Sequence, residues 1–308
     1  MEDKDIFTAI KNNDVAFVNK MINEDKSILN QRDYFGDLPI HVAAETSLDM
    51  VKALINLGAK VNQCGHDDQT PLFYAKNLEI AKYLVENGAR IEAENYRCET
   101  PIFRHIHWNN NEIVEYLIVN GANCYKRSCV SLLIHFAIQF INNDNDYLFD
   151  LICKNCDVNV VYNSYANSAT WAVSKNNLRW LKKLVNLGND LKFVDCFKDT
   201  LLHIAAKKSV AKDMFKYLFD SGIDINAKNI EGRTALMNFA YYGNRYELKE
   251  AKEIINLFIQ NGADCGLKDN KGHTAIDIAK YRMNDAIYDV LKEIDKNKNI
   301  NKHIAASE

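Results

Sequence analysis

The sequence lacks the features that mark several large classes of protein. No apolar run reaches the roughly 18 residues that a membrane-spanning helix needs, so we expect no membrane insertion. The first stretch, MEDKDIFTAIKNND, is acidic and has no hydrophobic signal core, which argues against secretion through a signal peptide. The net charge is only −3, which gives no reason to expect a nucleic-acid partner.

Common catalytic motifs are missing as well. The chain contains no GxSxG, HExxH or GxGxxG pattern. The nearest approach to a phosphate-binding loop runs from Gly266 to Thr274, but it has one residue too many and His273 where the lysine belongs. We therefore expect no enzyme activity, no catalytic residue, no cofactor and no metal.

One motif recurs along nearly the whole chain. Its copies begin 32, 30, 32, 35, 33, 34 and 40 residues apart. A second series runs in phase with the first, with LGAKVN, NGARIE, SGIDIN and NGADCG among its members. Two series with one period of about 33 residues predict a stack of similar units. The copies of the first motif are LPIHVAA (38–44), TPLFYAK (70–76), TPIFRHI (100–106), LLIHFAI (132–138), NSATWAV (167–173), TLLHIAA (200–206), TALMNFA (234–240) and TAIDIAK (274–280).

The pattern resembles the ankyrin repeat, which has a TPLHxAA helix start, a second helix and an exit similar to GADVN. The best matches are Thr70-Pro71-Leu72, residues 200–206 and Gly262-Ala263-Asp264, whereas the unit at 163–195 departs most. The resemblance implies an all-α solenoid of about eight helix-turn-helix repeats after an N-terminal capping unit. We expect one domain over residues 1–295 and a flexible tail over 296–308, with units starting near residues 5, 33, 65, 95, 127, 163, 196, 229 and 270.

The threonines, prolines and glycines that recur at fixed positions support this division of the chain into repeats. Threonine at a helix start can cap free backbone N–H groups, and all three prolines follow at the next position, where they are harmless. Nine of the twelve glycines fall at helix ends or turns, which leaves few for a nucleotide-binding loop. One unit is short, with 18 residues from Thr70 to Gly88, and one is long, with 28 from Thr234 to Gly262. We expect these length changes in loops or helix ends.

Cysteine and histidine offer the remaining routes to chemistry. Cys124, Cys129, Cys153 and Cys156 have spacings that could bind zinc, but the repeat phase places Cys124 and Cys156 in small apolar slots. A nucleophilic Cys98 or Cys129 with His66 or His105 stays open as an alternative, because such partners need only be neighbours in space. In ankyrin repeats, the slot of His41, His135 and His203 bonds to the loop backbone.

The resemblance also implies a binding surface, made of loop tips and the exposed face of the first helices. Aromatic and arginine side chains dominate protein interfaces, so we select those that the phase exposes. Arg104 and Trp108 are four residues apart and could stack, while His105 falls in a buried alanine slot and Trp180 in the core. Phe136 shares the slot of Arg104 and Trp171, which we expect to be exposed. The predicted binding residues are Tyr34, Phe35, Tyr96, Arg97, Arg104, His107, Trp108, Phe140, Tyr165, Trp171, Phe197, Tyr241 and Tyr242.

We therefore predict a monomeric, cytoplasmic, non-enzymatic module that binds another protein. Its composition, rich in asparagine, lysine and isoleucine, is similar to that of ankyrin effectors that intracellular bacteria deliver into host cells. Two alternatives stay open at this point. One is a cysteine-based hydrolase or transferase whose site is built on the solenoid, and the other is an inhibitor or immunity protein that blocks a toxin.

Overall fold

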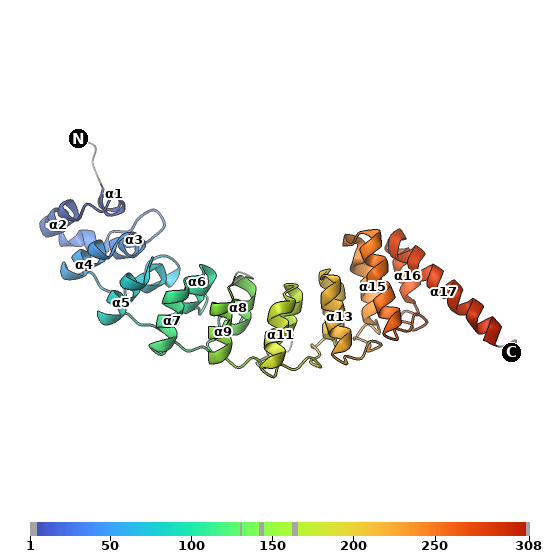
Figure 1. The fold of residues 1–308 in the computed structure, drawn as a ribbon. Coiled ribbons are helices and arrows are strands. Elements are labelled where there is room, and N and C mark those ends of the chain that lie inside the picture. The colour runs from blue at the N-terminus through green and yellow to red at the C-terminus, as the bar shows by residue number, and fades with distance from the viewer. Residues whose placement is uncertain (1–4, 130, 142–144, 162–165, 306–308) are drawn as a thin grey trace. The chain divides into compact units, whose positions relative to one another are not determined.

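The computed structural model describes residues 5–129, 131–141, 145–161 and 166–305, with side chains in the last helix described to residue 296. This part of the chain consists of α-helices and short 3-10 helices, together with one isolated antiparallel bridge between Arg127 and Leu132. The all-α class predicted from the sequence is confirmed. The chain divides into two compact units, Met1–Asp157 and Val158–Glu308, which are described separately (Figure 1).

Unit 1 is a stack of helix pairs. The first helices of successive pairs contact one another, α1 to α3, α3 to η3, η3 to α6 and α6 to α8, and the second helices form a parallel series from α2 to α9. The elements are α1 (Ile6–Lys11), α2 (Val15–Glu24), η1 (Lys26–Asn30), α3 (Pro39–Thr46), α4 (Leu48–Asn56), η2 (His66–Asp68), η3 (Pro71–Tyr74), α5 (Leu78–Glu86), α6 (Pro101–His107), α7 (Asn111–Val119), α8 (Leu133–Phe140) and α9 (Asp146–Asn155).

Unit 2 repeats this arrangement. Its first helices α10, α12, α14 and α16 contact one another in that order, and α15 lies between α13 and α17. The elements are α10 (Ser168–Ser174), α11 (Leu178–Asn186), α12 (Leu201–Lys208), α13 (Lys212–Asp220), α14 (Ala235–Tyr242), η4 (Gly243–Arg245), α15 (Leu248–Gln260), α16 (Ala275–Tyr281) and α17 (Asp285–Ala305). The helix α17 continues beyond residue 295, where the last predicted unit ends. The predicted single domain, its unit boundaries and the flexibility of the tail stay predictions.

The core forms where the apolar stripes of neighbouring helices meet. In α5, Ile80, Ala81 and Leu84 share one face and are fully buried. No short helix could bury such a stripe alone, so each pair depends on the next for its core. Trp180 is fully buried in α11, as predicted from its slot.

The helix ends follow the repeated glycines and threonines, although not every threonine caps a backbone N–H group. Gly58 and Gly88 end second helices with φ of +106° and +88°, a conformation that glycine adopts at little cost. The hydroxyls of Thr234 and Thr274 accept backbone N–H bonds at the helix start, as predicted. Thr70 and Thr100 were expected to do the same, but their hydroxyls are buried and cap no N–H group, so this prediction was wrong there.

Histidine side chains connect neighbouring repeats. The Nδ1 atom of His41 accepts from the N–H of Leu38 at 3.2 Å, and its Nε2 donates to the carbonyl of Gln69 at 3.0 Å. His203 makes the equivalent bonds in unit 2, to Thr200 and Arg233. The predicted structural role of this slot is confirmed at both positions. Burial lowers the pKa of each imidazole, which keeps it neutral and able to accept at Nδ1.

Asparagines at the repeat exits form a second connection. The side-chain amide of Asn62 donates to the carbonyl of Gly88 at 2.8 Å, while its oxygen accepts from the N–H of Arg90 at 2.8 Å. In unit 2, Asn226 makes the same pair of bonds with Gly262 and Asp264. Each asparagine therefore satisfies a donor and an acceptor at the helix end of the next repeat.

The two length variants change the helices rather than the stacking. In the short repeat the first helix shrinks to the 3-10 helix η3, followed directly by α5. In the long repeat the extra residues form η4 and lengthen the second helix, α15, to 13 residues. The extra residues of the long repeat extend helix ends, as expected, whereas the short repeat loses the regular form of its first helix.

Candidate protein-binding site

The side chain of Arg104 is held against two aromatic rings in unit 1. Its guanidinium carbon lies 4.2 Å from the ring centre of Trp108 and 4.4 Å from that of Tyr74. Arg104 and Trp108 share a face because they stand one helical turn apart at the end of α6, and Tyr74 comes from η3 of the preceding repeat. The stacking predicted for Arg104 and Trp108 is confirmed. A cation held over aromatic faces is attracted by their negative π-surfaces.

Polar partners fix the direction of this guanidinium. One terminal nitrogen of Arg104 donates to the side-chain oxygen of Gln69, and the other lies 3.9 Å from the carboxylate of Glu45. Partial burial raises the pKa of Glu45, although the nearby guanidinium acts in the opposite direction. The Tyr74 hydroxyl donates to Asp37 at 3.0 Å, which anchors the second ring. Arg104 is therefore ordered before any partner arrives, so binding would immobilise little that is mobile.

A row of aromatic rings continues from this pair into the next repeat. His107 lies edge-on to Phe140 with 4.8 Å between ring centres, and Phe140 lies 4.4 Å from Phe136. Phe136 in turn contacts Phe103 at 5.1 Å. The rings of His107, Phe136 and Phe140, together with Arg104, bound a cavity of about 330 Å³, which we call hollow A. Its lining includes Gln69, Arg97, Arg104, His107, Trp108 and Phe140.

Trp108 separates hollow A from a second depression, hollow B. Hollow B has a volume of about 270 Å³ and is lined by Glu45, Tyr74, Lys76, Trp108 and Asn110. The Trp108 side chain is 41% exposed, so it belongs to both cavities and also reaches solvent. A large ring between two depressions is the kind of anchor that contributes most to protein interfaces.

The loop tip of the same repeat forms the rim of hollow A. Tyr96 and Arg97 are both exposed, and the guanidinium of Arg97 lies 5.0 Å from the Tyr96 ring centre. Arg97 also donates from Nε to the Tyr96 hydroxyl. Of the thirteen residues predicted to bind, five therefore meet at this one cavity, namely Arg97, Arg104, His107, Trp108 and Phe140.

Two expectations about exposure need correction. Phe136 was expected in an exposed slot but is only 7% exposed, because it packs between Phe103 and Phe140. Arg104 and Trp171 in the same slot are half-buried. This slot faces the first helix of a neighbouring repeat, so a large side chain there becomes part of a repeat contact. Phe140 is half-buried as well, whereas Trp108 and Tyr242 are exposed.

The other predicted residues that the structure describes do not line hollow A. Tyr34 is 96% exposed at a loop tip of unit 1, with Phe35 edge-on beside it at 5.4 Å. Phe197 is exposed in unit 2. Tyr165 lies outside the described residues. The sequence prediction missed Tyr74, although it occupies the same slot of its repeat as Arg104, and that shared slot could have identified it.

Unit 2 has an arginine–tyrosine cluster of its own. The ring of Tyr241 lies 4.7 Å from the guanidinium carbon of Arg233 and 4.2 Å from that of Arg282. Tyr242 is beside it, with 4.6 Å between the ring centres. Arg233, Tyr241 and Tyr281 line a cavity of about 290 Å³, which we call hollow C.

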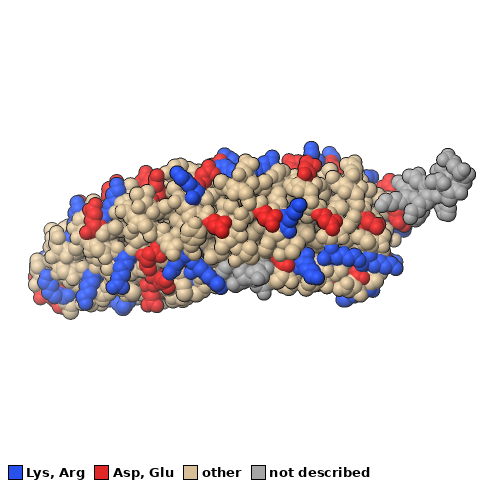
Figure 2. Space-filling view, turned by 90° about the horizontal axis from the view of Figure 1, so that it is seen from below, with Lys and Arg blue, Asp and Glu red and all other residues tan. Residues whose placement is uncertain are grey.

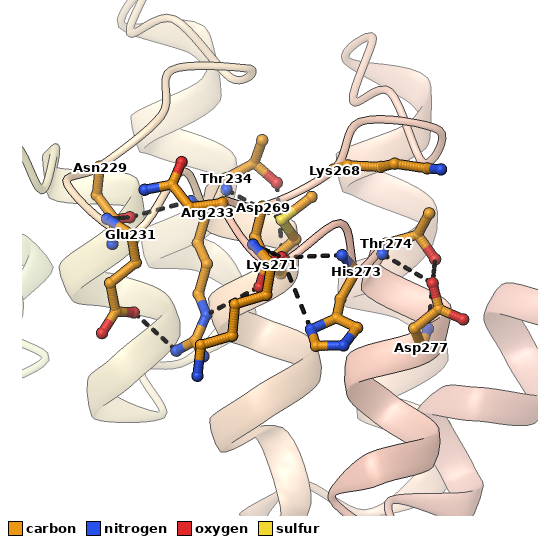
Figure 3. Close-up of polar contacts among 12 residues, drawn as sticks. Asn229, Glu231, Arg233, Thr234, Lys268, Asp269, Lys271, His273, Thr274 and Asp277 are labelled. Carbon is orange, nitrogen blue, oxygen red and sulfur yellow. Dashed lines mark hydrogen bonds and ion pairs between the residues drawn. The ribbon is translucent and has the colours of Figure 1, made fainter.

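A charged network supports hollow C. Figure 3 shows Asp269 between Arg233 and His273. Its carboxylate oxygens lie 3.9 Å from Nε of Arg233 and 3.7 Å from Nδ1 of His273. Burial disfavours the charged form of Asp269, but N–H bonds from His273 and Lys271 hold its pKa below the usual value. Arg233 also pairs with Glu231 at 2.8 Å. On the face in Figure 2, both signs of charge are interspersed over each unit.

His105, next to Arg104, is a structural residue. It is fully buried, as predicted, and its Nε2 donates to the carbonyl of Leu72 at 2.9 Å. Its Nδ1 lies 3.2 Å from the side-chain nitrogen of Asn110. Burial is the main cause that lowers the pKa of His105 to about 4. The ring is therefore neutral at pH 7, and both of its nitrogens are engaged, which leaves no lone pair for a nucleophilic cysteine.

Two properties of the described residues bear on other functions. Among them, no group of three or more histidine, cysteine, aspartate or glutamate side chains is arranged to hold a metal ion. The helices traced in residues 5–305 include none that is long and apolar enough to cross a membrane.

Comparison with known proteins gives one consistent result. The family model for ankyrin repeats matches residues 6–95, 134–229 and 213–302. The chain is 28% identical over 233 residues to an ankyrin repeat protein of Acanthamoeba polyphaga mimivirus, covering 74% of this chain and 29% of that protein. It is 23% identical over 296 residues to the human transient receptor potential cation channel subfamily A member 1, covering 80% of this chain and 26% of that protein.

A bacterial relative is shorter. The chain is 34% identical over 126 residues to an ankyrin repeat protein of Rickettsia bellii, covering 41% of this chain and 64% of that protein. The chain thus spans between a quarter and a third of the length of the viral and human relatives.

Proposed function

This chain belongs to the ankyrin-repeat family, and from that premise we propose that it is a non-enzymatic module that binds a partner protein through hollows A and B. Ankyrin-repeat domains typically bind proteins and are typically non-catalytic. The observation that carries the proposal is the half-exposed Trp108 between two depressions, stacked on the ordered Arg104. Specific recognition needs such a pre-arranged anchor because little ordering entropy is then lost on binding.

The lining of the two hollows favours an extended polypeptide segment as the ligand. Trp108 and Phe140 offer aromatic surface to an apolar side chain, and Arg97 at the rim offers a cation to a carboxylate. Gln69 and Asn95 add polar side chains to the lining of hollow A. We therefore propose a segment with an apolar residue near an acidic one.

Selection from a displayed peptide library tests this proposal. Peptides enriched on the wild-type chain are expected to pair an apolar side chain with an acidic one. Their affinity should fall at least about tenfold for Trp108→Ala, as for a typical interface anchor. The matched control is Tyr34→Ala, which removes another exposed aromatic ring at a loop tip that lines neither hollow. Equal affinity of the selected peptides for wild type and Trp108→Ala would overturn the assignment to these hollows.

We further propose that the partner belongs to a host cell and that the chain acts in its cytosol as an effector. The support is the similarity to the Rickettsia bellii ankyrin protein, together with the composition rich in asparagine, lysine and isoleucine. Pull-downs from host-cell extract and from extract of the source cells separate this role from an endogenous one. The effector role predicts a partner that the Trp108→Ala variant fails to retain, found in the host extract alone.

A further inference from the structure

Two cysteines from neighbouring repeats lie side by side at loop tips of unit 1. The sulfur of Cys98 is 3.2 Å from the sulfur of Cys129, although 31 residues separate them in the chain. The backbone holds both tips in place. The N–H of Cys129 donates to the carbonyl of Arg97, and the N–H of Cys98 to that of Asn95, each at 2.9 Å. The contact therefore results from the stacking of the repeats and needs no rearrangement of either loop.

Both sulfurs of this pair lie near the surface. Cys129 is exposed and Cys98 is half-buried, so a small reagent can reach them. Cys124, Cys153 and Cys265 are buried, and the thiol of Cys156 donates to the carbonyl of Cys124 at 3.1 Å. Cysteine oxidation follows exposure and thiolate content, so these structural thiols are poor targets.

We propose that Cys98 and Cys129 are a redox modification site that forms a reversible disulfide by exchange with a small disulfide such as oxidised glutathione. The sulfur atoms need to approach by only about 1 Å, because the S–S bond is about 2.05 Å long. This inference goes beyond partner binding and stands whether or not hollow A binds a peptide.

The exchange takes place in two steps. The Cys129 thiol loses its proton, and its thiolate attacks one sulfur of oxidised glutathione. This forms a mixed disulfide and releases one glutathione thiolate. The Cys98 thiolate then attacks the Cys129 sulfur, which forms the Cys98–Cys129 bond and releases the second glutathione. The two cysteine protons end on the two glutathione thiols, so two protein thiols are oxidised and one small disulfide is reduced.

The order of attack follows from the surroundings of the two sulfurs. Contact with the Cys129 thiol raises the pKa of Cys98. Cys129 is also the more exposed of the two. Cys129 therefore reacts first and Cys98 resolves the mixed disulfide. The cross-link would fix the tip that carries Arg97 at the rim of hollow A, and this consequence alone depends on the proposed binding function.

The test equilibrates the full chain in a series of oxidised and reduced glutathione ratios, followed by acid quenching, alkylation and tryptic mass mapping. Trypsin cuts after Arg97 and Arg127, so the expected product joins residues 98–104 to residues 128–154. Fragmentation then distinguishes Cys129 from Cys153 within the second peptide. We expect this linked peptide to be the main disulfide product and to disappear on addition of excess reduced glutathione.

Variants make the outcome decisive. Cys98→Ser should stop at a glutathione adduct on Cys129, while Cys64→Ser and Cys196→Ser, which remove exposed cysteines elsewhere, should leave the cross-link unchanged. In a denaturing concentration of urea the preference for this pair should be lost, since the fold creates it. Adducts without a cross-link in the wild-type chain, or preferential linkage of another pair, would overturn the proposal. Circular dichroism confirms that each variant is folded.

Discussion

The guanidinium carbon of Arg104 lies 4.2 Å from the ring centre of Trp108, one helical turn further along the chain. Together with Tyr74 from the preceding repeat, this contact fixes a cation and an indole at the wall between two cavities. The same combination of arginine and tyrosine recurs in unit 2 around Tyr241. Both sites use side chains that the repeat itself does not require.

Replacing Arg104 by lysine tests the stacking directly. Arg104→Lys keeps the charge, but an ammonium group cannot stack as a plane between two rings. We expect a loss of about 1 kcal/mol in the free energy of unfolding, measured in urea, together with weaker binding of the selected peptides. Lys20→Arg, at an exposed position of α2 that lines neither hollow, is a matched control that exchanges the same two residues in the opposite direction. If Arg104→Lys retained full stability and affinity, the guanidinium plane would have no role.

His105 should make the fold sensitive to acid. Its pKa is about 4 in the folded chain and about 6.5 when unfolded, so between these values the unfolded state binds the extra proton. The contribution of His105 to the free energy of unfolding is fully present above about pH 6.5. It falls as the pH drops toward 4, by roughly 3 kcal/mol in total.

Urea unfolding between pH 7 and pH 4 checks this dependence for wild type and His105→Ala. The variant should lose part of the acid sensitivity, and also some stability at pH 7 because a cavity forms. His107→Ala, which removes an exposed ring from the same helix, provides the comparison. Identical pH profiles for wild type and His105→Ala would show that the buried ring is not responsible.

The exit asparagines should contribute measurable stability. Asn62→Ala removes a donor and an acceptor that bridge to Gly88 and Arg90, and we expect a loss of about 1 to 2 kcal/mol. Asn62→Asp retains the acceptor but not the donor, and its carboxylate would be repelled by the carbonyl of Gly88 at the end of α5, so it should also be less stable than wild type. Thermal unfolding of wild type, Asn62→Ala and Asn62→Asp gives the order of their stabilities. A variant Asn62→Ala as stable as wild type would mean that water replaces both bonds at no cost.

Two glycines of unit 2 provide a matched pair for backbone strain. Gly232 and Gly262 have φ of +73° and +90°, so alanine is strained at both positions. A Cβ atom at Gly232 would also lie 2.8 Å from the backbone nitrogen of Asn270, whereas at Gly262 it would meet nothing within 4 Å. Gly262→Ala should lower the free energy of unfolding by about 1 kcal/mol, and Gly232→Ala should lower it clearly more. Equal losses in urea unfolding would show that the neighbouring loop yields freely.

The sequence determined the family, the all-α class and the phase of the repeats. Phase depends on local rules, since glycine ends a helix and apolar residues return at helical spacing whatever surrounds them. The repeat phase correctly predicted that His105 and Trp180 are buried and that His107 is exposed. It also predicted the stacking of Arg104 on Trp108, because residues four apart in a helix are neighbours on one face.

Only the tertiary structure decided what each side chain meets in the next repeat. Phe136 was expected to be exposed but is buried between Phe103 and Phe140, and Tyr74 was not expected beside Arg104 at all. The contact of Cys98 with Cys129 likewise spans 31 residues. Such contacts depend on the register between stacked repeats and on the rotamers chosen there. The spacing of residues within one repeat sets neither the register between repeats nor the rotamers. The sequence pattern therefore predicts which surface is exposed, but not which side chains meet there to form a site.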